Sequence, residues 1–269
     1  MYFLPLSHHE NMAQSKDGAS MMIGGLSVSF VVFAVLVALP LKALQTKAYS
    51  LALLSALLAY STRITQLLAR SVDMHSVSLR NLDSLRSKAL AAAQQLSGSN
   101  DLQLAAVSAL LLVTSRSPNP LHLGMHTPIA YQALMFLHAR AGSTRAWSLL
   151  RLDRFFQFAN EKYLEAFGLA TQLEIVTALT SLAEIFFPKQ SLLGPVRPVL
   201  LVQWLRLRNQ CGSDQVLKLR YPQRQRPSTL HAMFWNTLYQ RLQPYYSKVP
   251  YAERVIKAAS DWFHGRRAR

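Results

Sequence analysis

Cysteine, glycosylation signals and enzyme motifs are scarce or missing in this chain. Its 269 residues include one cysteine, Cys211, which excludes an intrachain disulfide and a cysteine-ligated zinc cluster. No Asn-x-Ser/Thr sequon occurs, so the sequence gives no support for a large lumenal loop. It contains no Walker loop, dinucleotide fingerprint, nucleophile elbow or zinc-protease motif. We therefore predict no catalytic residue, no cofactor and no metal site, and we expect a protein that is not an enzyme.

Charge of either sign is missing from one long run near the N-terminus. Gly18–Leu41 contains 24 residues without a charged side chain, and its centre, Phe30–Leu39, contains no polar side chain. As an α-helix this run would be about 36 Å long, which exceeds the roughly 30 Å of a bilayer core. It is also too long for the core of a signal peptide, and residues 1–17 contain a single basic residue. The run predicts an uncleaved membrane-spanning helix.

The basic residues after this run predict its orientation. Lys42 and Lys47 follow it directly, whereas residues 1–17 carry a slight negative charge. By the positive-inside rule, we expect residues 1–17 in the lumen and residue 42 in the cytosol. The next apolar block, Ala48–Thr62, has only 15 residues, so a full span and a helix embedded in one leaflet both remain open. The polar residues 73–101 predict a cytosolic helix.

The middle of the chain alternates apolar blocks with polar turns. Leu102–Val113 and Leu121–His138 flank a Pro-rich turn, which indicates a hairpin that either crosses the bilayer or wedges into it. Residues 140–162 are basic and aromatic, as in an interfacial helix. Residues 166–187 form the last long apolar block. We assign residues 18–205 to a membrane-embedded helical region.

Two pairs of polar residues in these blocks are candidates for chemistry. His122 and His126 have the i,i+4 spacing that places two imidazoles on one helical face for a metal, but Gly124 weakens that helix and no third ligand is near in sequence. Glu174 and Glu184 are carboxylates in an apolar block, where charge is costly and often functional. They lie roughly 80° apart on a helical wheel, so they do not form a tight pair. We favour structural roles for all four, with the acids packed against basic loops or lying at the membrane interface.

The last quarter of the chain carries most of the positive charge. Residues 206–269 contain 13 Lys and Arg against three Asp and Glu, without a recognisable nucleic-acid-binding module, so we predict no nucleic-acid partner. Pro227 predicts the start of a helix that Pro244 ends, and Pro250 with Glu253 predicts the first turn of a second helix. The two helices would form a basic amphipathic cytosolic tail that binds an anionic membrane surface or a protein partner. Its candidate binding residues are Phe234, Leu238, Leu242, Val255, Ile256, Ala259, Trp262, Phe263, Arg254, Lys257, Arg266, Arg267 and Arg269. The alternative is that this apolar stripe packs on the protein's own helices.

The order of these features resembles the nuclear-envelope and ER-shaping family that includes vertebrate transmembrane protein thirty-three and its fungal pore-membrane homologues. The motifs that carry the resemblance are Leu39-Pro40-Leu41, Ala52–Leu58, Leu137-His138, Gln203-Trp204-Leu205-Arg206-Leu207-Arg208 and the helix around Phe234 and Leu238. The resemblance implies no catalysis. It implies organisation of tubules and pore membranes, reticulon-type ER partners, and a C-terminal helix available to lipid or to a nuclear import receptor.

The sequence as a whole predicts an all-α, multi-span membrane protein with short hydrophobic hairpins and a C-terminal amphipathic tail. We expect it to organise or curve the membrane of the endoplasmic reticulum and nuclear envelope, including nuclear pores, with anionic headgroups as a partner. The alternative is an accessory structural subunit of a large complex in an organellar inner membrane. A transporter or enzyme that uses Glu174, Glu184 and His138 is a third hypothesis.

Overall fold

The computed structural model describes residues 18–71, 86–87, 90, 99–115, 117–182, 196–211, 230–246 and 248–264. Regular structure in these ranges is helical, so the predicted all-α fold is confirmed for them. In chain order the helices are α2 (Gly18–Ala38), α3 (Lys42–Ser71), α5 (Asn100–Thr114), α6 (Pro120–Gly124), α7 (Thr127–Ala141), α8 (Arg145–Leu149), α9 (Leu152–Ser181), α10 (Val196–Cys211), α12 (Leu230–Tyr246) and α13 (Pro250–His264).

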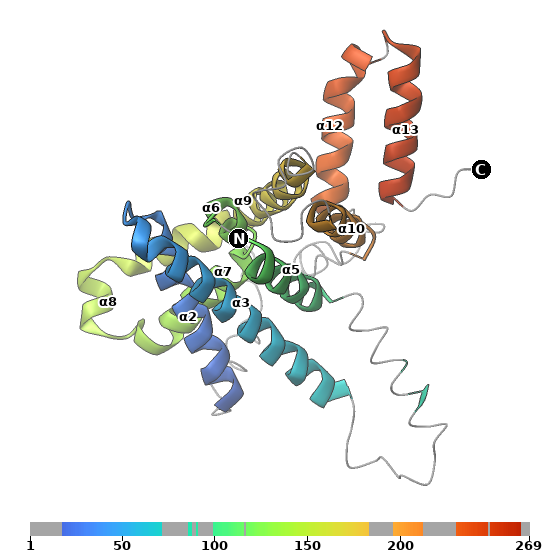
Figure 1. Cartoon of the computed structure of the whole chain (residues 1–269). Coiled ribbons are helices and arrows are strands. Elements are labelled where there is room, and N and C mark those ends of the chain that lie inside the picture. Colours follow the sequence, from blue (N-terminus) through green and yellow to red (C-terminus); the bar gives the residue numbers. More distant parts are fainter. Residues whose placement is uncertain are drawn as a thin grey trace.

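The first two helices form an antiparallel hairpin (Figure 1). Pro40 separates them, because a proline disfavours helical conformation in the residue before it. α3 has 30 residues, twice the length of the predicted apolar block Ala48–Thr62. It continues past Arg63, whose side chain pairs with Asp101 at 3.3 Å and donates to Gln132 at 3.2 Å. Within α3, the segment Leu44–Leu68 is long and apolar enough to cross a membrane, and so is α2.

Small side chains let the other helices approach α3 closely. Ala52, Ala56 and Ala59 are fully buried, and their spacing places them on one face of the helix. α2 and α5 pack against α3, with Leu111 of α5 fully buried in the same core. On α2, Gly24 lets α7 approach closely, because a Cβ at that position would overlap the ring of Phe136.

The predicted hairpin around the Pro-rich turn is present, but its second arm is broken. α5 begins with Ser99, whose hydroxyl accepts from the backbone of Leu102, and α6 begins with Asn119 capping Leu121 at 3.0 Å. α6 then ends at Gly124, and α7 starts anew at Thr127. The arm predicted over 121–138 is thus two helices.

The prediction of a single interfacial helix over residues 140–162 is wrong. α7 ends at Ala141, the five-residue α8 follows, and α9 starts at Leu152. Two local features turn the chain: Thr144 caps α8 by accepting from the backbone of Trp147, and Arg151 adopts the left-handed conformation with φ 53°. A left-handed residue cannot continue a right-handed helix, so α9 begins after it.

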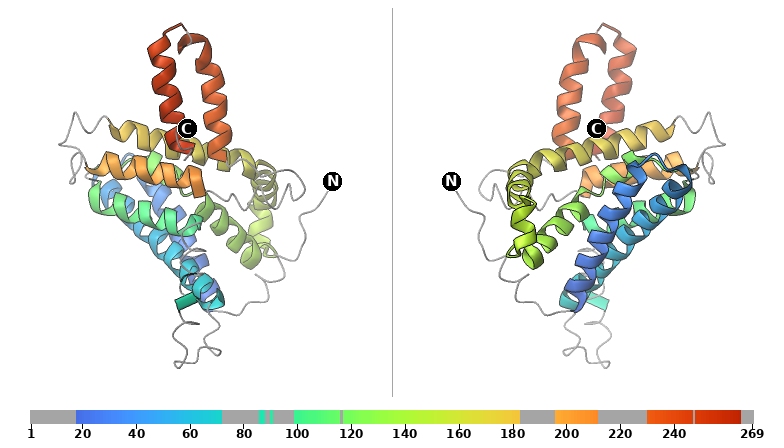
Figure 2. Two further views of the ribbon diagram at one scale, coloured as in Figure 1. Left: turned by 90° about the vertical axis from the view of Figure 1, so that its right-hand side faces the viewer. Right: turned by 90° about the vertical axis from the view of Figure 1, so that its left-hand side faces the viewer.

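The last four helices form the upper part of the molecule. Figure 2 shows α9 and α10 running across one end of the bundle, with the α12–α13 hairpin rising from that layer. α13 begins at Pro250 with Glu253 in its first turn, as predicted. Pro244 does not end α12 as predicted, because it lies in the last turn, where a lost hydrogen bond interrupts little, and the helix continues to Tyr246. The predicted boundary at residue 205 falls inside α10.

Candidate membrane interface and buried polar centre

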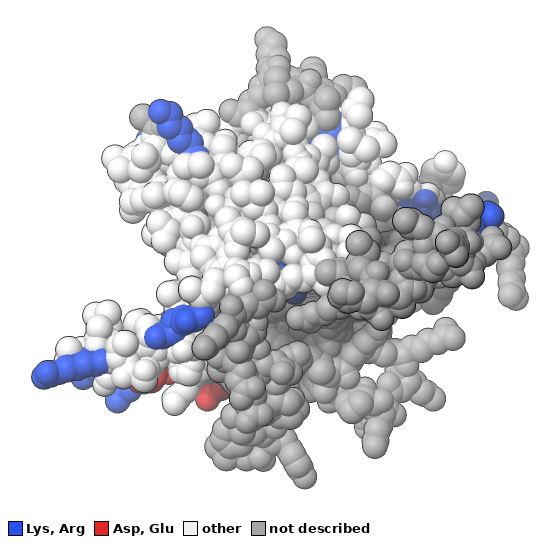
Figure 3. Space-filling model, turned by 90° about the horizontal axis from the view of Figure 1, so that it is seen from below, with Lys and Arg blue, Asp and Glu red and all other residues white. Residues whose placement is uncertain are grey.

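The outer surface of the α2–α3 hairpin is apolar and uncovered. Most side chains in these two helices are not buried within the protein. The large exposed apolar side chains on them are Met21, Met22, Val32 and Val35 of α2 and Leu44, Leu51, Leu54 and Leu58 of α3. Figure 3 shows a broad face of the described residues that is almost free of Lys, Arg, Asp and Glu, with blue side chains at its edges. Large exposed apolar side chains on two neighbouring helices, with few charges around them, mark a surface that is covered by a partner or by lipid.

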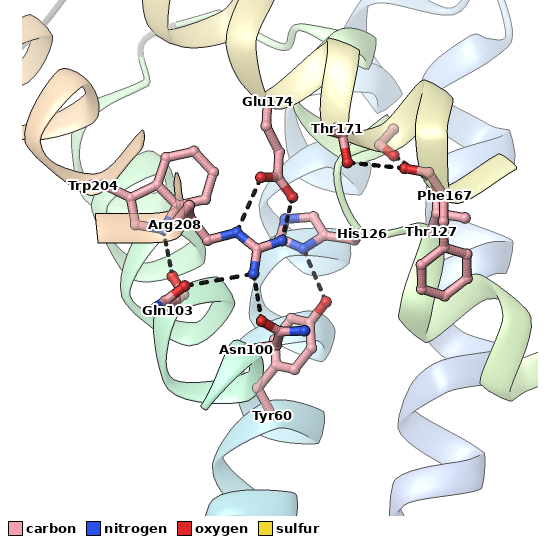
Figure 4. Close-up of polar contacts among 11 residues, drawn as sticks. Tyr60, Asn100, Gln103, His126, Thr127, Phe167, Thr171, Glu174, Trp204 and Arg208 are labelled. Atoms are coloured by element: carbon pink, nitrogen blue, oxygen red, sulfur yellow. Dashed lines mark hydrogen bonds and ion pairs between the residues drawn. The ribbon is translucent and has the colours of Figure 1, made fainter. Parts of the chain in front are cut away.

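One predicted acid, Glu174, lies at the centre of the protein. Its carboxylate accepts two hydrogen bonds from Arg208 of α10, at 3.0 Å from Nε and 2.7 Å from Nη2 (Figure 4). The Glu174 and Arg208 side chains are only 2% and 8% exposed. Paired contacts of this kind are the strong form of a carboxylate–guanidinium interaction. The prediction that this acid packs against a basic residue is confirmed, although the partner lies in a helix and not in a loop.

The remaining donors of the same guanidinium bind α5. Arg208 Nη1 donates to Asn100 Oδ1 at 2.7 Å and contacts Gln103 Oε1 at 3.5 Å, and the indole of Trp204 donates to the Gln103 backbone oxygen at 2.8 Å. One turn of α10 therefore ties α9 to α5 through a nearly saturated polar network. This network joins the base of the C-terminal tail to the helical body.

His122 and His126 do not share a helical face. His122 belongs to α6, whereas His126 follows its end, because Gly124 terminates the helix. Each imidazole meets a tyrosine of α3: His122 Nδ1 lies 2.6 Å from the Tyr49 hydroxyl, and His126 Nδ1 lies 3.4 Å from that of Tyr60. Burial lowers the pKa of His122 to about 3 and that of His126 to about 4. Both rings are therefore neutral at physiological pH and act as buried hydrogen-bonding groups.

The third hypothesis, a site built from Glu174, Glu184 and His138, is not supported by the geometry. His138 stacks on Phe156, with ring centroids 3.7 Å apart. Phe156 precedes Glu174 by 18 residues on the single helix α9, which separates them by about 27 Å along its axis. Glu184 lies outside the described residues. Among the described side chains, no three His, Cys, Asp or Glu gather closely enough to hold a metal ion.

The predicted binding residues of the tail divide into two groups. At the base of the hairpin, Phe234 packs against the hydrophobic core, and Arg206 of α10 lies 4.3 Å above the Trp262 ring and donates to the Trp262 backbone oxygen at 3.0 Å. Further along the two helices, Leu242 and Val255 are exposed. Internal packing therefore occupies the base, whereas Leu242 and Val255 further along are open.

The other predicted residues of the tail complete this division. Leu238 and Ile256 are half-buried, and Arg254 and Lys257 are exposed. The side chains of Ala259 and Phe263, together with Arg266, Arg267 and Arg269, lie outside the described part of the chain, as do most of the residues predicted to form a helix over 73–101. The amphipathic character of α13 thus remains a sequence prediction at its C-terminal end.

A basic and apolar corner between α7 and α9 is a feature that the sequence indicated only in outline. Four arginines, Arg140, Arg145, Arg151 and Arg154, are exposed there, and we call this group the arginine corner. The corner lies beside the N-terminal end of α2, because Arg140 Nη2 contacts Met21 Sδ at 2.7 Å. The sequence signal was the basic and aromatic composition of residues 140–162.

Comparison of the chain with protein-family models, with curated proteins and with solved structures finds no match. The class that the described residues define is an all-helical protein with two helices long and apolar enough to cross a membrane. The resemblance to the membrane-shaping family of transmembrane protein thirty-three stays a prediction from the sequence motifs.

Proposed function

We propose that this chain is a non-enzymatic integral membrane protein that organises or curves the membrane of the endoplasmic reticulum and nuclear envelope. The observation that supports insertion into a membrane is the exposed apolar surface of α2 and α3. Side chains such as Val32 and Leu54 face outwards, where water would disfavour them and acyl chains would not. The assignment to the endoplasmic reticulum and nuclear envelope, and to nuclear pores, comes from the sequence resemblance.

Two full crossings would return the chain to the side on which it began. A lumenal N-terminus and a cytosolic segment 73–101, both expected from the sequence, are then incompatible. The balance of charge favours the cytosol for both: the arginine corner lies at the N-terminal end of α2, against Lys42 and Lys47 at the other end. We therefore propose that the N-terminal end of α2 and the C-terminal end of α3 both face the cytosol.

Site-specific labelling tests this topology. In a Cys211→Ser background, Ser143→Cys near the arginine corner and Thr46→Cys at the start of α3 place single thiols at exposed positions on opposite ends of the hairpin. We expect an impermeant maleimide to label position 143 from the cytosolic side of sealed microsomes, and position 46 only after permeabilisation. The reverse pattern would restore the lumenal N-terminus.

A matched pair of lysine substitutions tests whether α2 faces lipid. Val32 on α2 and Val249 in the turn between α12 and α13 are both exposed valines. A lysine near the centre of a spanning helix costs roughly 2.5–3.5 kcal/mol, whereas on a water-facing surface it costs little. Val32→Lys should therefore reduce the fraction of protein that resists alkaline extraction from membranes, and Val249→Lys should not. Equal tolerance of both would refute the membrane assignment.

Membrane shaping would follow from an uneven distribution of volume between the two leaflets. The α2–α3 hairpin, together with the shorter helices packed on it, would wedge into the bilayer, and the basic tail would add area on the cytosolic face. Purified protein reconstituted at high density should convert vesicles into tubules or small vesicles, visible by electron microscopy. Unchanged vesicle shape at the same density would refute the shaping activity while leaving membrane insertion intact.

A second candidate function is a structural subunit of a large organellar membrane complex. The observation that favours it is the tip of the α12–α13 hairpin, where Tyr245 and Tyr251 are 75% and 77% exposed. Exposed tyrosines are enriched in protein interfaces. A subunit of this kind would migrate with its complex on a native gel, and Tyr245→Ser with Tyr251→Ser would release it.

A further inference from the structure

The corner between α7 and α9 combines positive charge with projecting apolar side chains. Residues 139–160 contain four arginines and one acid, Asp153, whose carboxylate accepts from the Trp147 indole at 2.9 Å. Beside the exposed arginines, Leu149 and Leu150 of the α8–α9 turn are 72% and 70% exposed. Water is a poor environment for two adjacent leucines, and no helix of the described chain covers them.

The start of α9 extends this surface. Phe155 and Phe158 are 56% and 58% exposed, whereas Phe156 between them is buried against His138. The helix therefore divides its aromatic rings between the interior and the surface, and the outward rings lie near Arg151 and Arg154 in sequence. Apolar rings flanked by arginines fit the boundary between acyl chains and headgroups.

The position of the corner fixes its depth relative to the apolar hairpin. Arg140 contacts Met21, three residues after the start of α2, and its guanidinium lies 5.8 Å from the centre of the Phe136 ring. The end of a membrane-spanning helix is the level at which the headgroups of one leaflet begin. If α2 spans the bilayer, the arginines of the corner therefore lie at headgroup level.

The backbone at Arg151 gives an independent indication. Glycine adopts this left-handed conformation freely, whereas the Cβ atom of any other residue makes it strained. Strain held at an exposed charged residue points to a use for that side chain. The turn directs the guanidinium-bearing residue outwards at the junction of α8 and α9, next to the exposed Leu150.

We propose that the arginine corner, with Leu149 and Leu150, is a binding surface for the phosphate-bearing headgroups of anionic lipids in the leaflet that the N-terminal end of α2 reaches. This inference rests on the proposed membrane insertion of α2 and α3. The guanidinium groups bind the phosphates, and the two leucines enter the acyl region beside them. The surface is separate from the C-terminal tail and holds the α7–α9 junction flat on the membrane.

A probe within the corner tests this proposal on the full-length protein. In a Cys211→Ser background, Ser148→Cys carries an environment-sensitive fluorophore at an exposed position of α8 that is neither apolar nor basic. The protein is reconstituted into phosphatidylcholine vesicles with increasing fractions of phosphatidylserine. We expect the emission to shift to the blue as phosphatidylserine is added, and the shift to weaken as salt is raised.

Matched charge variants identify the groups responsible. An arginine near an anionic surface is worth about a five-fold change in lipid affinity, so Arg145→Gln with Arg154→Gln should weaken phosphatidylserine binding by about 25-fold and remove most of the shift at the phosphatidylserine fraction that half-shifts the unaltered protein. Lys42→Gln with Lys47→Gln, the same charge loss at the other end of the hairpin, should leave it unchanged. Equal effects of the two pairs would overturn the proposal, because they would reveal only a dependence on net charge.

The Arg151→Gly variant tests whether a loss of lipid affinity comes from misfolding. Glycine removes the charge and relieves the left-handed strain, so the variant should melt at the same or a higher temperature while lipid affinity falls about five-fold. Unchanged affinity would overturn the role of Arg151. Flotation of the vesicles separates this inference from the proposed function: protein that floats in high salt but shows no phosphatidylserine response refutes the corner alone, and protein that does not float refutes membrane insertion as well.

Discussion

Replacing Glu174 by Gln removes the negative charge of the buried ion pair and leaves the positive charge of Arg208 buried without an anionic partner. Arg208 would keep its bonds to Asn100 and Gln103 but lose a carboxylate that accepts at 2.7 Å and 3.0 Å. Loss of one partner of a buried pair costs about 3–5 kcal/mol, and the two remaining acceptors place this variant near the lower end, at about 3 kcal/mol. At roughly 2–4 °C per kcal/mol, we expect the melting temperature to fall by about 6–12 °C.

Three variants measured together make this test decisive. Thermal unfolding of the purified full-length protein in detergent micelles should give the large loss for Glu174→Gln. The double variant Glu174→Gln with Arg208→Met removes both charges and should recover most of it, because no ion is then left buried without a partner. Glu165→Gln is the matched control, since Glu165 forms a solvent-exposed pair with Lys162 at 2.7 Å and should not change the melting temperature measurably.

The refuting result is equally specific. If Glu174→Gln melts like Glu165→Gln, the buried network does not hold α10 to α9 and α5. If the double variant is no more stable than Glu174→Gln alone, the loss comes from the carboxylate's volume or hydration and not from a stranded charge. Either outcome would remove the proposed link between the helical body and the base of the tail.

Two further predictions concern the same core. Gly24→Ala should destabilise the protein by about 1–3 kcal/mol, because the new methyl group overlaps Phe136, whereas Gly25→Ala, which lies inside α2 and meets no atom, should be neutral or slightly stabilising in the same melting assay. The pKa values of His122 and His126 lie well below the ordinary 6.5 because both rings are buried, so the unfolded chain binds protons first as the pH falls. Stability should therefore drop as the pH falls below 6.5, with a slope that approaches about 1.4 kcal/mol per pH unit for each histidine near pH 5, and replacing His126 by Asn should remove one histidine's share of that slope in denaturant titrations; a slope that does not change would refute the role of burial.

Local features of the sequence were enough to predict much of the architecture. The charge-free run became α2, and Pro250 with Glu253 marked the start of α13. These predictions held because each depends on a single chemical property of a short segment, such as a missing backbone donor or a long apolar stretch. The prediction over residues 140–162 failed because a capping threonine and one left-handed arginine redirected the chain, and neither has a strong compositional signature.

The sequence by itself determined that this chain is helical and rich in apolar blocks, and that its positive charge gathers towards the C-terminus. Only the tertiary structure decided which polar groups meet. Glu174 and Arg208 are 34 residues apart, and the contact of Arg140 with Met21 joins positions 119 residues apart. Periodicity and composition describe neighbours along one helix, whereas these contacts depend on how several helices pack against one another. For that reason the buried ion pair and the depth of the arginine corner emerged only from the fold.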